Sequence, residues 1–354
     1  MTEKEAYIAF NLTDRIGNVA LVKLVSEYGS AAKAWETLPD DKRVSRSGLA
    51  IDAERELKLA KRYGVAIVTP LDKDYPAILK SCARHPLALY VKGNVAALSQ
   101  TAVAMVGTRK ASQYGLDQAY LIGKGLAERG VAVVSGLALG IDAASHQGVL
   151  AGHGTAIGVL GSALDKFYPE QNRQLARDIV EAGGAVVSQF PFGRECDTTT
   201  FPIRNQVVAA LSLGVVAIES PARSGTLLTC ADALDLGRPV MALPGRVDSR
   251  FSAGCLNLIA DGARMIRSAA DICDELGIKA EVKDAPSSAA PRPRFSLEES
   301  LIMRNLGHEG ISMDKLIAQT RLDAGKVSAL CMSLRLQGRL RFLPGNRVAL
   351  PRED

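Results

Sequence analysis

Five glycine-bearing turns in this sequence could bind an anion. Each follows a short apolar run, and the turns begin at Gly107, Ser135, Gly161, Ser224 and Gly245. Glycine lets backbone N–H groups approach a phosphate closely, and helix N-termini add partial positive charge. Turn geometry alone would explain any one of them, but the set favours a phosphate pocket. The candidate residues are Gly107, Thr108, Arg109, Ser135, Gly136, Gly140, Ser224, Gly225, Thr226 and Arg246.

Two further groups sharpen the expected chemistry. Arg109 stands directly after the first of these strands, where its guanidinium can grip a phosphate with two parallel hydrogen bonds. Phe201 precedes Arg204 and Asn205 at the start of a helix. Phe201 is either a core residue or a platform on which an unpaired base stacks, with Arg204 holding the neighbouring phosphate. The residues leave both interpretations of Phe201 open.

A catalytic or metal centre is hard to assemble. The dinucleotide pattern Gly-x-Gly-x-x-Gly is absent after the first strand, and no Cys-x-x-Cys pair occurs among the six cysteines. His146 and His153 have no evident nucleophile beside them, and Asp142 and Asp165 are interpreted as caps. We therefore expect a protein that is not an enzyme, with no cofactor and no metal.

The elements that must position these residues alternate between short strands and helices. Strands are predicted at 102–106, 131–135, 155–160, 185–188, 215–218 and 240–243. Helices are predicted at 114–129, 172–182, 203–211 and 227–236. Strands that are apolar throughout and are separated by helices indicate an α/β fold with a parallel sheet covered on both faces. We predict a Rossmann-like, doubly wound domain, whose ligand crevice lies at the carboxyl ends of the strands.

Smaller domains are expected on either side of this sheet. Residues 1–74 show helical spacing, with a weak likeness to a SAM or helix-hairpin-helix domain. Residues 75–277 form the central domain, and the proline-rich stretch 278–294 is interpreted as a linker. Residues 295–354 read as helices followed by a two-stranded hairpin, which is the winged-helix layout.

Composition excludes several classes of protein. The chain has 354 residues, 47% of them hydrophobic and 23% charged, which is neither a disordered chain nor a coiled coil. No apolar run is long enough to span a membrane, and the amino-terminal residues do not look like a secretory signal. The net charge of +5 permits a polyanionic partner without requiring one. We expect a cytoplasmic protein with reduced thiols.

Taken in order, the central segments resemble the DNA-processing protein A family (DprA, also called Smf). The matching stretches are VGTRKAS (106–112), SGLALGIDAASH (135–146), LGSALDKFYPEQN (160–172), FPIRNQVVAALS (201–212), ESPARSGTLLTC (219–230), GRPVMALPG (237–245) and SAGCLNLIADGA (252–263). The flanking helical and winged-helix segments also fit the common layout of that family.

This resemblance implies a non-catalytic protein that binds single-stranded DNA in natural transformation and recombination. Such proteins protect incoming strands, load the recombinase RecA and form homodimers. The resemblance makes Arg109 a DNA contact and Phe201 the aromatic near the bases, followed by Arg204 and Asn205. Gly136, Gly140 and residues 224–226 would be pocket turns. Segment 263–276 is the candidate dimer surface.

The sequence departs from the family pattern near Phe201. Ile203 and Gln206 stand where basic residues are common, residues 198–200 are threonines, and Glu170 replaces a lysine of some relatives. These changes remove positive charge and are expected to affect affinity more than the mode of binding. Three other arginines could compensate: Arg194, Arg246 and Arg250.

Two other functions remain possible on the sequence. The first is a nucleotide-binding enzyme of the phosphoribohydrolase (lysine-decarboxylase-like) kind, but the turn at Ser224 lacks its glycine run and catalytic acid. The second is a transcriptional regulator that reads duplex DNA through the winged helix. The expected recognition helix, 324–336, offers few groups for base edges, so weak duplex binding or protein contact is the favoured role of that domain.

Overall fold

The computed structural model describes residues 1–13, 15–44, 51–279, 297–307, 310–320, 322–336 and 339–350. Internal contacts divide the chain into two units, Met1–Ala285 and Pro286–Asp354. Each unit is described by itself below. The predicted linker lies outside the described residues except for Ile278 and Lys279, and Ile278 packs against the central core.

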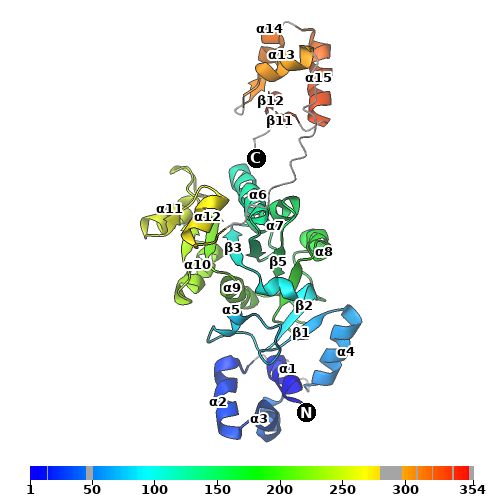
Figure 1. Ribbon diagram of the computed structural model, residues 1–354, viewed down its shortest axis with the longest axis vertical. Coiled ribbons are helices and arrows are strands. Elements are labelled where there is room, and N and C mark those ends of the chain that lie inside the picture. Colours follow the sequence, from blue (N-terminus) through cyan, green and yellow to red (C-terminus); the bar gives the residue numbers. More distant parts are fainter. Residues whose placement is uncertain are drawn as a thin grey trace. The chain divides into compact units, whose positions relative to one another are not determined.

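The first unit begins with helices, as predicted (Figure 1). They are α1 (Glu3–Thr13), α2 (Asn18–Tyr28), α3 (Ala31–Thr37), the short η1 (Asp40–Lys42) and α4 (Ala53–Tyr63). Two begin with a side-chain cap, because the oxygens of Ser30 and Asp52 accept hydrogen bonds from the backbone N–H three residues later. Gly64 ends α4 in a left-handed conformation.

A nine-stranded sheet forms the centre of this unit. Its strands lie in the order β1-β2-β6-β5-β4-β3-β7-β8-β9. Their bounds are β1 (Ala66–Val68), β2 (Leu89–Gly93), β3 (Ala102–Gly107), β4 (Ala132–Ser135), β5 (Ala156–Val159), β6 (Ala185–Ser188), β7 (Val215–Glu219), β8 (Val240–Ala242) and β9 (Arg264–Met265). In this order every neighbouring pair from β6 to β9 is parallel, whereas the β1–β2 and β2–β6 pairs are antiparallel.

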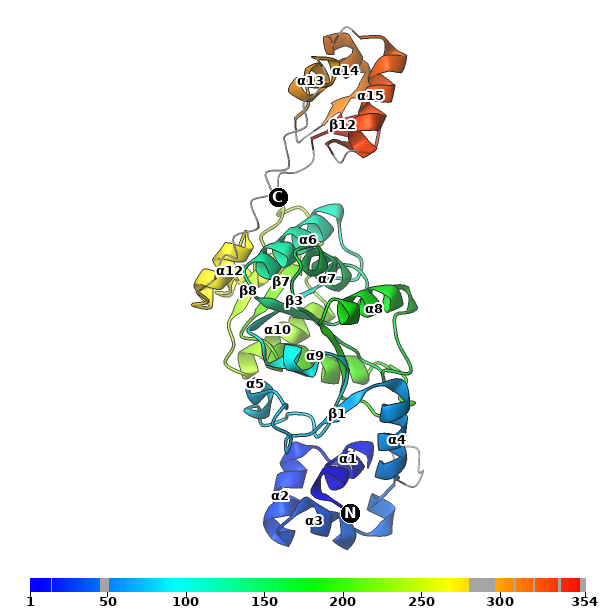
Figure 2. The same cartoon turned by 45° about the vertical axis from the view of Figure 1, so that its right-hand side comes forward.

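Helices cover both faces of the sheet (Figure 2). Alternate residues of β3 enter two separate cores: Val103 and Met105 pack with α6, α7, α8 and α12, and Ala104 and Val106 pack with α5, α9, α10 and α11. These helices are α5 (Ala77–Lys80), α6 (Gln113–Glu128), α7 (Ile141–Ala151), α8 (Arg173–Glu181), α9 (Thr200–Ala210), α10 (Gly225–Asp235), α11 (Ala253–Ala260) and α12 (Ala269–Glu275). The predicted doubly wound α/β fold is confirmed.

The amino-terminal helices share a core with the edge of this sheet. Tyr90 of β2 is fully buried in the same cluster as Phe10 and Trp35, with Phe192 packed against it. The buried Glu56 carboxylate of α4 accepts the Phe192 backbone N–H at 2.9 Å. Burial raises the pKa of Glu56. The helices are therefore joined to the sheet by apolar packing and by a buried acceptor.

The second unit has the winged-helix layout. Its helices are α13 (Leu297–Arg304), α14 (Met313–Thr320) and α15 (Ala324–Leu336), and its strands are β10 (Ile311–Ser312), β11 (Arg341–Leu343) and β12 (Arg347–Ala349). The strands pair antiparallel in the order β10-β12-β11. Asp323 caps α15 by accepting the Gly325 N–H at 2.9 Å. The helix ends at Leu336, as its predicted bounds of 324–336 require.

The sequence located six strands of the central sheet and missed four others in the chain. Strands β1, β2, β9 and β10 are not among those predicted. β1 lies before residue 74, so a strand of the central sheet precedes the boundary drawn there. The assignment of residues 1–74 as all-helical is wrong at this strand, and the other domain boundaries stay predictions. No helix among the described residues is long and apolar enough to cross a membrane.

We predict that His146 makes the fold acid-sensitive. This α7 side chain is fully buried, and burial lowers its pKa to about 4 from 6.5. The unfolded chain therefore binds the proton first, so stability is complete above pH ~6.5 and is lost as pH falls towards ~4. Between pH ~7 and ~5 the wild type should lose about 2 kcal/mol more than His146→Gln. Urea unfolding at both pH values measures this, and equal losses would contradict it.

Candidate functional site

The sequence-predicted turns meet at one edge of the sheet. β3, β4, β5, β6, β7 and β8 are parallel, so the loops after them share the carboxyl edge. The loops also bond to one another: the Thr108 N–H donates to the Glu219 carbonyl at 2.8 Å, and the Ile141 N–H donates to the Thr108 carbonyl at 3.3 Å. The expected crevice is therefore a connected set of turns.

An arginine and two aromatic rings lie together at this edge. The Arg109 guanidinium carbon lies 4.8 Å from the centroid of the Phe201 ring. The Tyr168 ring lies 6.3 Å from Phe201, measured between centroids, and Tyr168 is 48% exposed. Arg109 is exposed and Phe201 is half-buried. A cation above one aromatic face and a second ring beside it leave a polar and an apolar contact open to a ligand.

Glycine is required where these loops approach each other. Gly140 has φ +81°, and a Cβ there would lie 2.8 Å from the Arg109 carbonyl oxygen. A Cβ on Gly161 would lie 2.9 Å from the Phe201 ring, and one on Gly107 would collide with Ile141. These three glycines let the backbone hold Arg109 and Phe201 together. Their role is therefore close packing.

Arg204 is turned into the protein, which differs from the sequence expectation. It is 5% exposed, and its Nη1 donates to the carbonyls of Gly136 and, at 2.8 Å, of Val159. Its Nε donates to the Asn205 amide oxygen at 3.0 Å. A guanidinium bound in this way is not placed to hold a phosphate in solvent. We assign Arg204 a positioning role at the base of α9.

The hydrogen-bond donors of the turn after β4 are also paired within the protein. The Asp142 carboxylate accepts the Gly136 N–H at 3.1 Å and the Ala138 N–H at 3.3 Å. Ser135 is fully buried, and its hydroxyl donates to the Met105 carbonyl at 2.6 Å. Burial raises the pKa of Asp142, and the charge of Arg204 opposes that rise. The expectation that Ser135 and Gly136 cradle a phosphate conflicts with these bonds, because their donors are already used.

Ser224, Gly225 and Arg246 lie nearer the solvent, whereas Thr226 is buried. Ser224 caps α10 by accepting the Thr226 N–H at 3.2 Å, and Gly225 is exposed with open space where a side chain would begin. Arg246 is exposed, but two of its nitrogens donate to the Asp248 carboxylate at 2.9 and 2.8 Å. The Ser224 turn is thus an open helix terminus, while Arg246 carries its own counterion.

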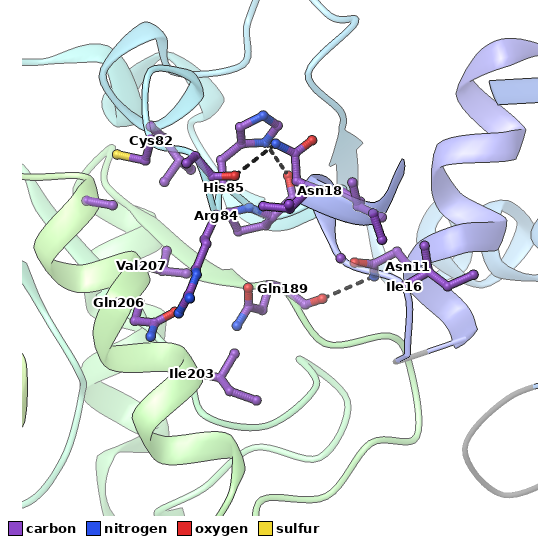
Figure 3. Close-up of a pocket in the computed structure, with 18 of the residues that line it drawn as sticks. Asn11, Ile16, Asn18, Cys82, Arg84, His85, Gln189, Ile203, Gln206 and Val207 are labelled. Atoms are coloured by element: carbon purple, nitrogen blue, oxygen red, sulfur yellow. Dashed lines mark hydrogen bonds between the residues drawn. The ribbon is translucent and has the colours of Figure 1, made fainter. Parts of the chain in front are cut away.

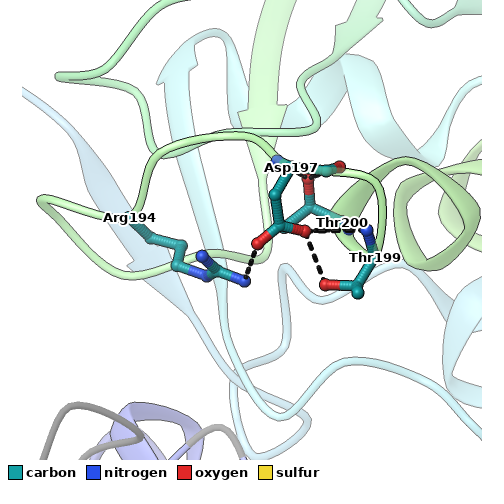
Figure 4. Close-up of polar contacts among 4 residues, drawn as sticks. All are labelled: Arg194, Asp197, Thr199 and Thr200. Atoms are coloured by element: carbon teal, nitrogen blue, oxygen red, sulfur yellow. Dashed lines mark hydrogen bonds and ion pairs between the residues drawn. The ribbon is translucent and has the colours of Figure 1, made fainter.

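The threonine stretch before Phe201 orders the start of α9 (Figure 4). The Asp197 carboxylate accepts the Thr199 N–H at 2.7 Å, the Thr200 N–H at 3.0 Å and the Arg194 Nη2 donor at 2.8 Å. The hydrogen bonds from Thr199 hold the pKa of Asp197 well below its usual range. Arg194 is consequently bound to a carboxylate of its own loop.

Two residues of this edge were not among the predicted site residues. Glu219 is 3% exposed and accepts the Ser112 N–H at 2.7 Å and the Ser112 hydroxyl at 2.6 Å. It fixes the start of α6 against the end of β7. The sequence feature that could have indicated Glu219 is an acidic residue at the end of an otherwise apolar strand. Tyr168 lies beside the Arg109–Phe201 contact, and only the family-like stretch around Tyr168 could have indicated this.

The packing of Gly136 against Arg204 predicts a stability difference between two glycines. A Cβ on Gly136 would collide with the buried guanidinium, so Gly136→Ala should cost about 1–3 kcal/mol. Gly225→Ala is the matched control, because a Cβ at that position would have nothing within 4 Å. It should leave stability unchanged or raise it slightly. Chemical unfolding checks both, and equal stabilities for the two variants would contradict the account of Arg204.

Two family models match most of this chain. The family model described as DNA recombination-mediator protein A matches residues 66–277, and the DprA winged helix domain matches residues 284–346. Protein Smf of Escherichia coli is 35% identical over 288 residues, covering 80% of this chain and 77% of that protein. DNA processing protein DprA of Streptococcus pneumoniae is 38% identical over 205 residues, covering 58% of this chain and 72% of that protein.

Two solved structures agree with this assignment. The crystal structure of DNA processing protein A from Streptococcus pneumoniae aligns with TM-score 0.64 and 32% identity over 78% of this chain and 98% of that one. The Helicobacter pylori protein aligns with TM-score 0.54 and 26% identity over 60% of this chain and 97% of that one. The matching domains, the relatives and the doubly wound core together show that this chain belongs to the DprA/Smf family of DNA-processing proteins.

Proposed function

We propose that the protein binds single-stranded DNA along the carboxyl edge of its central sheet. The observation that carries the proposal is the exposed Arg109 guanidinium lying 4.8 Å above the Phe201 ring, with Tyr168 beside it. Unpaired bases stack on aromatic side chains regardless of sequence, and arginine neutralises the adjoining phosphate. The Helicobacter pylori relative is described by its single-stranded DNA binding mode, which supports the same ligand here.

Further cations lie on loops of the same edge. Lys110, Arg223 and Arg250 are exposed on the loops after β3, β7 and β8. Basic side chains at the rim would follow the phosphate backbone, while Phe201 and Tyr168 face the bases. Among the predicted contacts, Gly107, Thr108, Gly140, Asn205 and the Ser224–Thr226 turn shape this edge. Ser135, Gly136 and Arg204 hold it from inside.

The acids near the edge support binding without catalysis. Asp142 is buried and engaged with the Gly136 and Ala138 N–H groups, and Glu219 is engaged with Ser112. A general base must reach the substrate, and both carboxylates are instead used as internal acceptors. This supports a non-enzymatic role over the phosphoribohydrolase alternative.

The family description as a recombination mediator supports a wider role. We propose that the protein protects incoming single strands in the cytoplasm and loads the recombinase RecA onto them during natural transformation or recombination. We further propose that it acts as a homodimer. The winged helix would add weak duplex or protein contact.

Substitutions at the edge test the proposal directly. Arg109→Ala should weaken binding of a labelled oligothymidylate by ~1.5–3 kcal/mol, the range for removing a charged hydrogen bond. Phe201→Ala should cost ~1–3 kcal/mol because a base can no longer stack there. Arg246→Ala is the matched control, because that guanidinium is already paired with Asp248 and its removal should matter less. Fluorescence anisotropy measures all three, after circular dichroism has shown that each variant is folded.

An unchanged affinity in folded Arg109→Ala would contradict the proposal. A decrease in Arg246→Ala equal to that in Arg109→Ala would mean that rim charge alone binds DNA. Either result would mean that the Arg109–Phe201 contact does not have the role assigned to it.

Binding should also depend steeply on salt. Neutralising about three or four phosphates of a single strand gives a slope of roughly −2 to −3 in log K against log salt concentration. Titrations of single-stranded and duplex oligonucleotides at several salt concentrations check this slope. A flat salt dependence, or tighter binding of the duplex, would argue against a phosphate-binding edge for single strands.

A further inference from the structure

A cleft of about 840 Å³ lies beside α9 (Figure 3). Its walls come from the turn between α1 and α2, the segment before β2, the segment after β6, and helices α9 and α10. All of these belong to the first unit. The volume is in the range that protein clefts use for ligands. The site described above does not include this cleft.

The walls of this cleft carry both basic and acidic groups. Arg15, Lys23 and Arg84 line it, are exposed, and form no ion pair with a residue that the structure describes. Asp232 and Asp235 line the side formed by α10. Burial raises the pKa of Asp232, and the neighbouring Asp235 adds to that rise. A ligand that complements these groups is anionic where it meets the basic side chains and offers hydrogen-bond donors to the acidic ones.

Uncharged groups in the cleft suit a planar ligand. The Gln189 Nε2 atom is buried and has no hydrogen-bond partner among the described residues. Figure 3 shows Arg84 extending toward Gln206 of α9, with Gln189 between them and Asn11. Ile203 is 39% exposed and supplies an apolar surface. Amide groups and an apolar wall can contact the edge and the face of a base.

Helix α9 carries both the Phe201 contact and one wall of the cleft. Phe201 lies in the first turn of this helix, while Ile203 and Gln206 line the cleft. At ~1.5 Å rise per residue, Phe201 and Gln206 are separated by roughly 7.5 Å along the helix axis. Pro202 is exposed and lies between them on the helix surface. Ile203 and Gln206 lie about 200° and about 140° around the helix from Phe201, so a strand joining the two sites would pass over the exposed first turn of α9.

We propose that this cleft receives the continuation of the DNA strand bound at the carboxyl edge. The phosphates face Arg15, Lys23 and Arg84, and base amino groups face Asp232 and Asp235, which accept hydrogen bonds as acidic side chains do from cytosine. Ile203 and Gln206, which remove charge relative to the family pattern, then serve as base contacts. The inference rests on the proposed function and extends the same binding path.

Oligonucleotide length separates the two parts of the path. We compare oligodeoxycytidylates of about 6 and about 20 nucleotides, within and beyond the ~4–16 nucleotide range of single-strand sites. The double variant Arg15→Glu/Arg84→Glu should bind the long strand about 10-fold more weakly, and its salt slope should be shallower by about 0.7 for each phosphate that is no longer neutralised. The short strand should bind as it does to the wild type.

Arg62→Glu is the matched control, because this exposed arginine is on α4 and does not line the cleft. It should leave both affinities unchanged. Equal decreases for the two lengths, or no decrease for either, would overturn the extended path. Saturable binding of dCMP alone that the double variant abolishes and Arg109→Ala preserves would assign the cleft to free nucleotides and would also overturn it.

Arg109→Ala distinguishes failure of this path from failure of the proposed function. If it weakens both lengths while the double variant weakens neither, only the extended path is wrong. If Arg109→Ala weakens neither length, the proposed function fails as well. Thermal unfolding of each variant confirms that the exposed substitutions leave the fold intact.

Discussion

The buried guanidinium of Arg204 is the constraint on which the carboxyl edge depends. It bonds to the carbonyl of Gly136 after β4 and to that of Val159 at the end of β5, and it faces the buried charge of Asp142. Removing one partner of such a buried pair typically costs about 3–5 kcal/mol. Because Arg204 lies in the first turns of α9, the same contact sets where that helix begins. Phe201 is thereby held at the edge of the sheet.

The two arginines near Phe201 have different roles, one in the protein interior and one at its surface. Arg204 satisfies carbonyls that no strand reaches, while Arg109 is exposed above the aromatic ring. Asp142 and Glu219 act in the same way as Arg204, since each ties a turn to its neighbour. The interior polar groups make the loops rigid, so the exposed cation and rings meet a ligand in one arrangement. Preorganisation of this kind lowers the entropy cost of binding.

The sequence could predict what depends on local pattern. Continuous apolar runs revealed the six central strands, and glycine beside Ser, Thr or Arg indicated the turns at their ends. It could not predict that Arg204 is internal, because its carbonyl partners lie 45 and 68 residues away in the chain. A strand of two residues, such as β9, carries too few residues for a pattern. The cleft beside α9 was also hidden, since its walls come from five separate segments.

A crystal structure with a short oligothymidylate tests the central claim most directly. The account predicts a phosphate within hydrogen-bond distance of the Arg109 guanidinium, a base against Phe201 or Tyr168, and Arg204 still bound to the carbonyls of Gly136 and Val159. A strand bound away from Arg109, or an Arg204 side chain that leaves those carbonyls to contact the DNA, would contradict it.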